Sequence, residues 1–201
     1  MIKRNLLVMG LAVLLSACGF QLRGTGTNEL AIKELDLSAR NAYGETVTQL
    51  RQVLESSGVK VVSGAPYKLF LSNEQENQRI LSYAGAGRTG EYQVTTVLNY
   101  DIRGQNNLDL LSDKLEVQKI FMHDGNNLVG SDQEAATARG ETRRELIQRM
   151  MLRLQQLTPA QLDQLQQTAD ARAKAEAAAL EAAQKAEAET PRQSPLELPK
   201  Q

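Results

Sequence analysis

Hydrophobic and polar residues alternate most regularly between Tyr92 and Arg103. One face of this segment is mainly apolar and carries Tyr92, Val94, Thr96, Leu98, Tyr100 and Ile102. The other face is mainly polar and carries Gln93, Thr95, Val97, Asn99, Asp101 and Arg103. This alternation is typical of a strand in an antiparallel sheet with one buried face. Turn residues over 104–107 and a second apolar run over about 110–122 predict a hairpin.

Shorter patterns precede this hairpin. Residues 31–38 favour a strand, and the run Val47, Leu50, Val53 and Leu54 has helical spacing. A helix is therefore predicted over about 42–57, because Ser57-Gly58 supplies a C-terminal cap. Strand patterns follow over 59–62 and 67–72, separated by a Gly-Ala-Pro break.

A second amphipathic helix is predicted after the hairpin. Ser131 and Glu134 match a capping box that would open it. Thr158-Pro159-Ala160-Gln161 is a second box, with proline at the first helical position, and predicts a helical extension over 158–189. Bulky apolar residues nearly vanish beyond Leu165, so this extension is expected to be solvated. Three prolines over 190–201 predict a disordered tail.

These elements predict a two-layer α+β sandwich over residues 18–157. Two amphipathic helices would cover the apolar face of a mainly antiparallel, mixed sheet. The opposite face would stay polar, with Lys114, Glu116 and Gln118 of the second hairpin strand beside the polar residues of the first.

The N-terminus has the layout of an export signal. Lys3 and Arg4 precede an apolar run from Leu6 to Leu15, which has the length of a secretory h-region. It is well short of the roughly 20 apolar residues that span a bilayer. Leu15-Ser16-Ala17-Cys18 resembles the lipobox of bacterial lipoproteins, so residues 1–17 are predicted to be a signal peptide and Cys18 to be lipidated. Ordinary cleavage that leaves a free thiol is the alternative, and bulky Leu15 disfavours it.

Composition narrows the functional classes. Cys18 is the only cysteine, so no disulfide can form within the chain, and the covalent lipid is the only attached group expected. The formal net charge of −1 argues against a nucleic-acid partner, which would require a basic surface. Gly19, rather than aspartate, follows the cysteine, which resembles the pattern of lipoproteins sent to the outer membrane.

The sequence lacks the combination of residues that a catalytic site would need. His123 is the only histidine, and Asp124 and further loop-forming residues follow it, which predicts a turn residue. No second cysteine and no close carboxylate cluster accompany it, so neither a hydrolytic triad nor a metal site is expected. The chain is therefore predicted not to be an enzyme.

Three glycines match the spacing of a phosphate-binding loop. Gly85, Gly87 and Gly90 fit G-x-G-x-x-G, but a strand follows them where a dinucleotide site requires the start of a helix. The segment is therefore predicted to be a flexible connection between strands. Arg88 lies within it and is a candidate for contact with an anionic group, with a simply solvated arginine as the alternative.

Residues 18–24, Cys-Gly-Phe-Gln-Leu-Arg-Gly, resemble the start of mature LPS-assembly lipoproteins of the LptE family. The resemblance continues through 50–59 and Glu91-Tyr92-Gln93 and covers roughly 18–157. It implies two helices on one face of a four-stranded sheet. It also implies a plug inside the LptD β-barrel of the outer membrane, which helps to assemble that barrel and to deliver lipopolysaccharide to the cell surface.

The resemblance further implies direct lipopolysaccharide binding by basic residues, which suit phosphate by charge and donor geometry. Arg88 is the first candidate and Lys114 the second. Residues 130–132 read Gly-Ser-Asp where a lysine would be expected. Two other functions remain as alternatives. One is a periplasm-facing adaptor that binds another envelope protein through the polar sheet face, and the other is an anchored hydrolase, which the missing catalytic groups disfavour.

Overall fold

The computed structural model describes residues 30–84 and 89–189. Cys18, Arg88 and the predicted tail over 190–201 lie outside these residues. The elements of the described part, in chain order, are β1 (Glu34–Ala39), α2 (Glu45–Ser56), β2 (Lys60–Val61), β3 (Lys68–Ala84), β4 (Thr89–Arg103), the short 3-10 helix η1 (Gln105–Asn107), β5 (Asp109–Asp124), α3 (Leu128–Gln155) and α4 (Pro159–Glu189).

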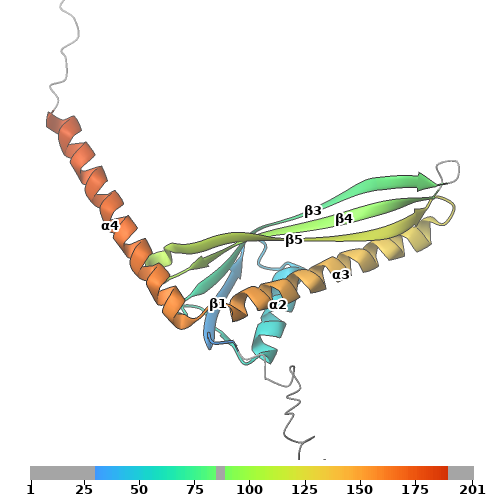
Figure 1. Cartoon of the computed structure of the whole chain (residues 1–201), viewed down its shortest axis with the longest axis horizontal. Helices are drawn as coiled ribbons and strands as arrows, with labels where there is room; N and C mark the ends of the chain where they lie inside the picture. The colour runs from blue at the N-terminus through green and yellow to red at the C-terminus, as the bar shows by residue number, and fades with distance from the viewer. Residues whose placement is uncertain (1–29, 85–88, 190–201) are drawn as a thin grey trace, which may run out of the picture.

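The strands form one mixed sheet in the order β2-β1-β3-β4-β5. β1 is parallel to both of its neighbours, whereas β3, β4 and β5 pair antiparallel. β1 reaches only the first residues of β3, from Lys68 to Leu71. The three long strands therefore continue without β1 to the end of the molecule where β3 and β5 end and β4 begins (Figure 1). This end is called the distal end below.

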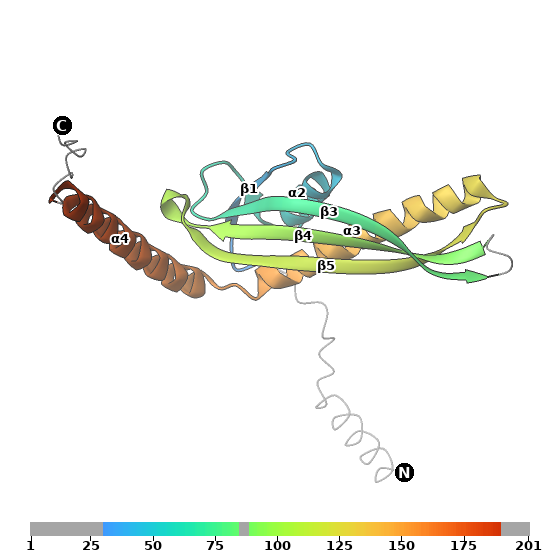
Figure 2. The ribbon, with the colours of Figure 1, turned by 90° about the horizontal axis from the view of Figure 1, so that it is seen from above.

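α2 and α3 cover one face of the sheet, and the other face is left open (Figure 2). The two-layer α+β architecture predicted from the sequence is therefore confirmed. The sheet has five strands and not four, because Lys60 and Val61 pair with Glu34 and Leu35 as a two-residue edge strand. The described part has three α-helices and not only the two on the sheet, since α4, which lies in the predicted helical extension, projects away from the sandwich (Figure 1).

The core lies between α2, α3 and the apolar face of β4. The alternating residues Val94, Leu98, Tyr100 and Ile102 of β4 are all buried. α3 places Leu146, Met150 and Leu154 against the sheet at helical spacing, and α2 contributes Val47, Leu50 and Leu54. Most of the apolar positions singled out in the sequence thus belong to one main core, and Val94 belongs to a second, smaller cluster with Phe121, Ala135 and Ala138.

α3 begins four residues earlier than the capping box at Ser131 predicts. Asn127 is the N-cap, and its side-chain oxygen accepts from the N–H of Gly130 at 3.0 Å. Buried Ser131 instead ties the first turn of the helix to the end of β5. Its hydroxyl accepts from the N–H of Asp124 at 2.7 Å and donates to the Asp124 carbonyl at 3.1 Å.

The second predicted capping box is present at the start of α4. The N–H of Gln161 donates to Thr158 Oγ1 at 3.3 Å, and the N–H of Thr158 donates to Gln161 Oε1 at 3.0 Å. Leu162 is fully buried, and the backbone N–H of Gln105 donates to Gln166 Oε1 at 2.9 Å. These contacts fix the base of α4 against the sheet, whereas every residue from Lys174 to Glu189 is exposed.

Candidate functional site

The register of the three long strands gathers polar side chains on the uncovered side of the sheet, called the open face below. Thr95 pairs with Asn77 and Gln118, and Asn99 pairs with Asn73 and Lys114. Paired residues of neighbouring strands share a face. The central members of the open face are Asn73, Gln75, Asn77, Arg79, Gln93, Thr95, Val97, Asn99, Lys114, Glu116 and Gln118. The predicted placement of Lys114, Glu116 and Gln118 beside the polar residues of β4 is therefore confirmed.

A chain of side-chain hydrogen bonds crosses the open face. Arg79 Nε donates to Gln93 Oε1 at 2.6 Å, and Gln93 Nε2 donates to Gln118 Oε1 at 2.5 Å. Gln118 Nε2 in turn donates to Glu116 Oε1 at 2.7 Å. Because each member is held by the next, the face presents ordered amide groups rather than mobile ones.

A second polar cluster lies at the opposite end of the same face, where β4 ends and β5 begins. The Arg103 guanidinium contacts Asp109 at 2.7 Å and lies 4.3 Å from the centre of the Phe70 ring. Ser112 Oγ donates to Asp101 Oδ1 at 2.7 Å. The open face therefore carries its charges in fixed pairs at this end, and the stretch between the two clusters is mainly uncharged.

Lys114 is the exception in that stretch. It lies on β5 opposite Asn99, it is exposed, and its ammonium makes no ion pair within the described part of the chain. The distal end of β5 lies ten residues further along, which is roughly 33 Å of extended strand. Thr89, the residue after Arg88, pairs with Asp124 at that distal end. Lys114 therefore lies far from Thr89, and Arg88 itself is outside the described residues.

The distal end carries exposed apolar side chains on both faces of the sheet, which periodicity did not predict. This set is called the distal tip below, and its exposed members are Ile80, Leu81, Tyr83, Ile120, Met122, Leu128 and Val129. They come from β3, β5 and the first turn of α3, which meet at one end of the molecule (Figure 1). Exposed apolar side chains that gather at one end of a molecule are a common feature of interaction sites. The only sequence signal was two apolar pairs, Ile80-Leu81 and Leu128-Val129, within polar surroundings.

His123 belongs to the distal end of β5 and is not the turn residue predicted from the sequence. It shares the helix-covered face with Tyr92, and the centres of the two rings lie 4.7 Å apart. The loop-forming residues that follow His123 do form a turn, but the turn begins only after Asp124, where β5 ends. Among residues 30–84 and 89–189, no group of three or more potential metal ligands converges.

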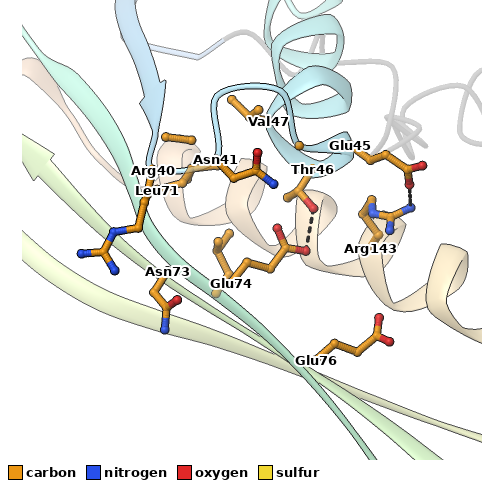
Figure 3. Close-up of a pocket in the computed structure, with 13 residues that line it drawn as sticks. Arg40, Asn41, Glu45, Thr46, Val47, Leu71, Asn73, Glu74, Glu76 and Arg143 are labelled. Atoms are coloured by element: carbon orange, nitrogen blue, oxygen red, sulfur yellow. Dashed lines mark hydrogen bonds and ion pairs between the residues drawn. The ribbon is translucent and has the colours of Figure 1, made fainter.

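A pocket of about 350 Å³ lies where β1 ends and β3 continues alone, and it is called the corner pocket below. Thr46 Oγ1 donates to Glu74 Oε1 across it at 2.7 Å, and Glu45 pairs with Arg143 at its rim (Figure 3). Arg40 lies at the end of β1 and also lines it. Most of its charged groups are therefore already paired within the chain.

The side chains with shifted pKa values lie in contacts between elements rather than in a cleft. Burial, together with the nearby charge of Asp113, raises the pKa of Tyr100 to about 12. Burial and the hydrogen bond to Asp163 raise the pKa of Tyr67, also to about 12. The hydrogen bond from Arg149 lowers the pKa of the Glu145 carboxyl. Each of these shifts follows from packing of a helix against the sheet or its loops, or from a pair within a helix.

No helix among the described residues combines the length and the apolar character that a membrane span requires.

Comparison with known proteins gives concordant results. The family model LptE, described as lipopolysaccharide-assembly, matches residues 32–154. The LPS-assembly lipoprotein LptE of Yersinia enterocolitica is 28% identical over 170 residues, which cover 82% of each chain. The corresponding protein of Pectobacterium atrosepticum is 29% identical over 74% of this chain and 83% of its own. The crystal structure of rare lipoprotein B from Shewanella oneidensis has the same fold, with a TM-score of 0.53 and 21% identity over 60% of this chain and 91% of its own.

Proposed function

Because this chain belongs to the LptE family of lipopolysaccharide-assembly proteins, we propose that it acts as a plug in the lumen of an LptD-type β-barrel. In this role it is held at the periplasmic side of the outer membrane by lipid on Cys18. It assists assembly of the barrel and delivery of lipopolysaccharide to the cell surface.

The open face is the observation that carries this proposal. The lumen of a large outer-membrane barrel is polar. A body placed inside it needs a stable core of its own and a surface whose hydrogen-bonding groups are set in advance. The bonds from Arg79 through Gln93 to Gln118 provide such a surface over three strands. The stretch around Asn99 carries no charge other than the ammonium of Lys114, which limits the cost of removing water from it.

The lipid anchor supports the same role by restricting where the protein diffuses. Each buried methylene of an acyl chain contributes about 0.8 kcal/mol to membrane binding, so an acylated Cys18 is expected to hold the protein firmly at the membrane surface. Confinement to that surface raises the effective concentration of the plug near a barrel in the same membrane.

Affinity purification of the tagged, full-length lipoprotein in mild detergent is expected to recover the barrel protein in a one-to-one ratio. A charge placed on the open face by Thr95→Glu is expected to reduce this recovery at least tenfold, because an unpaired carboxylate would be buried at the contact. The matched control is Leu180→Glu on the exposed part of α4 and is expected to leave recovery unchanged. Absence of the barrel with the unaltered chain would reject the plug role, and recovery of a different envelope protein would favour an adaptor.

The distal tip supports a second proposal, that the chain binds lipopolysaccharide directly at this end. Its apolar side chains, such as Tyr83 and Val129, suit acyl chains, and Arg88 is separated from the tip by only a few residues of sequence. Arg88→Ala is therefore expected to weaken lipopolysaccharide binding by the full chain roughly tenfold, since a charge-assisted hydrogen bond contributes about 1.5–3 kcal/mol. Lys114→Ala is expected to have a smaller effect because Lys114 lies far from the tip. Equal affinity and salt dependence for both variants and the unaltered chain would contradict direct binding by these residues.

A further inference from the structure

β3 has a long outer edge that no strand covers. β1 pairs with β3 only from Lys68 to Leu71, and β3 continues to Ala84. Every residue from Glu74 to Tyr83 is exposed. This segment, residues 73–83, is called the free edge below. A row of unpaired backbone N–H and C=O groups on such an edge is a template for another strand.

The positions that face outward on the free edge follow from the hydrogen bonds at its start. The N–H of Arg40 donates to the carbonyl of Leu71 at 2.9 Å, so Leu71 directs its backbone groups towards β1. A bulge before Asn73 then inserts one residue into β3. Because backbone direction alternates along a strand, the bulge moves the outward positions from odd to even residue numbers. The outward positions between the bulge and Ile80 are therefore Glu74, Glu76 and Gln78.

The opposite edge of the sheet, on β5, is protected in a way that the free edge is not. The guanidinium of Arg149 donates to the outward carbonyl of Glu116 at 2.6 Å. Lys114, at the preceding outward position, adds an exposed lysine, which is a common device against strand addition. Residues 73–83 contain neither lysine nor proline. The contrast between the two edges indicates that the edge of β3 is kept open for a partner.

The side chains along the free edge are largely engaged within the chain. Arg139 of α3 donates to Glu76 at 2.7 Å and to Gln78 at 3.1 Å, and Thr46 donates to Glu74. Arg79, on the other face, is bonded to Gln93. What remains available is mainly the backbone, together with the amides of Asn73, Gln75 and Asn77.

From this arrangement we infer that the free edge of β3 accepts one extended segment of the barrel protein, which joins the sheet as an additional strand. The segment is polar on both faces and nearly neutral, because it lies between amides on the open face and paired charges on the helix side. The corner pocket lies where such a strand would begin or end, in line with β1, and takes one of its side chains (Figure 3). Main-chain hydrogen bonds supply most of the affinity in this mode of recognition. The inference rests on the proposed plug function and specifies how the plug is held.

Hydrogen–deuterium exchange of the full-length lipoprotein, alone and in its purified complex with the barrel, tests the inference directly. The amides of Glu74, Glu76 and Gln78 are expected to exchange at least tenfold more slowly in the complex. Peptides that cover 112–120 of β5 serve as the internal control and are expected to change less. Unchanged exchange on the free edge, or protection of β5 alone, would overturn strand addition. Failure of the unaltered chain to retain any barrel would reject the plug function instead.

Two substitutions of one residue, Glu76→Pro and Glu76→Ala, provide the matched test of binding. Glu76→Pro removes an outward N–H without removing a hydrogen bond to β4, since proline is tolerated on a strand edge. It is expected to reduce recovery of the barrel at least tenfold. Glu76→Ala removes the same side chain, including its ion pair to Arg139, but keeps the N–H, and it is expected to recover at least five times more barrel than Glu76→Pro. Equal recovery with the two variants, each shown by circular dichroism to be folded, would overturn the inference. If Glu76→Pro does not fold, the exchange measurement alone decides.

Discussion

Replacement of Leu146 by alanine is expected to lower the free energy of unfolding by about 2–5 kcal/mol, because the buried site cannot close around the missing atoms. Leu146 is 0% exposed and belongs to the stripe of α3 that packs on the sheet. Leu152 lies on the same helix but is 58% exposed. Leu152→Ala is therefore the matched control and is expected to change stability by no more than about 0.5 kcal/mol.

Urea denaturation followed by circular dichroism measures both variants under identical conditions. The large effect is expected because α3 lies over β5 and β4 and holds the helical layer to the sheet. A buried hydrogen bond supports the same contact, in which Thr96 Oγ1 donates to Thr142 Oγ1 at 3.1 Å. If Leu146→Ala lowered the free energy of unfolding no more than Leu152→Ala does, α3 would contribute little to the stability of the core.

The strand with the clearest alternation was also the one best predicted from the sequence. β4 runs from Thr89 to Arg103, and its apolar face is buried from Val94 to Ile102 as the pattern indicates. Alternation is informative there because α3 covers one face of the strand while the other stays open. The polar residues of the open face on β4 and β5 were predicted for the same reason. Residues of β5 that pair with the polar positions of β4 share their face, and these include Lys114, Glu116 and Gln118.

The distal half of β3 could not be predicted in this way. Its sequence from Asn73 to Arg79 is Asn-Glu-Gln-Glu-Asn-Gln-Arg, which is polar at every position. Its side chains are largely exposed, so neither face required apolar residues, and the segment is held by pairing with β4 and by polar contacts from Thr46 and Arg139. The free edge and the corner pocket depend on this segment. Hydrophobic periodicity could therefore not predict them, because it detects only strands that have one buried face.

The start of α3 shows a different limit. Both Asn127 and Ser131 are residues that cap helices, and the glutamate three positions after Ser131 favoured the later start. The structure uses Asn127 because Ser131 is occupied by the end of β5, where it exchanges two hydrogen bonds with Asp124. This contact depends on how the strand and helix meet in three dimensions, so local sequence could not distinguish the two caps.

The glycine at position 90 is explained by the packing of two strands and not by phosphate binding. A bulge between Ile80 and Ser82 brings the carbonyl oxygen of Ser82 to 2.5 Å from the place where a Cβ on residue 90 would lie. Backbone atoms cannot move aside as a flexible side chain can. Gly90→Ala is therefore expected to force β3 and β4 apart near the distal tip and to lower the free energy of unfolding by about 1–3 kcal/mol.

Gly140→Ala is the control for this substitution and is expected to have the opposite sign. Gly140 lies inside α3, and the nearest atom to its added Cβ, Arg144 Nη1, is 3.6 Å away. Alanine at that position is expected to raise the free energy of unfolding by roughly 0.5–1 kcal/mol, because glycine loses more backbone entropy in a helix. Urea denaturation distinguishes the two outcomes in one experiment. A Gly90→Ala variant as stable as the unaltered chain would mean that the strands at the distal tip separate at almost no cost, and the tip would then be a mobile hairpin rather than a fixed surface.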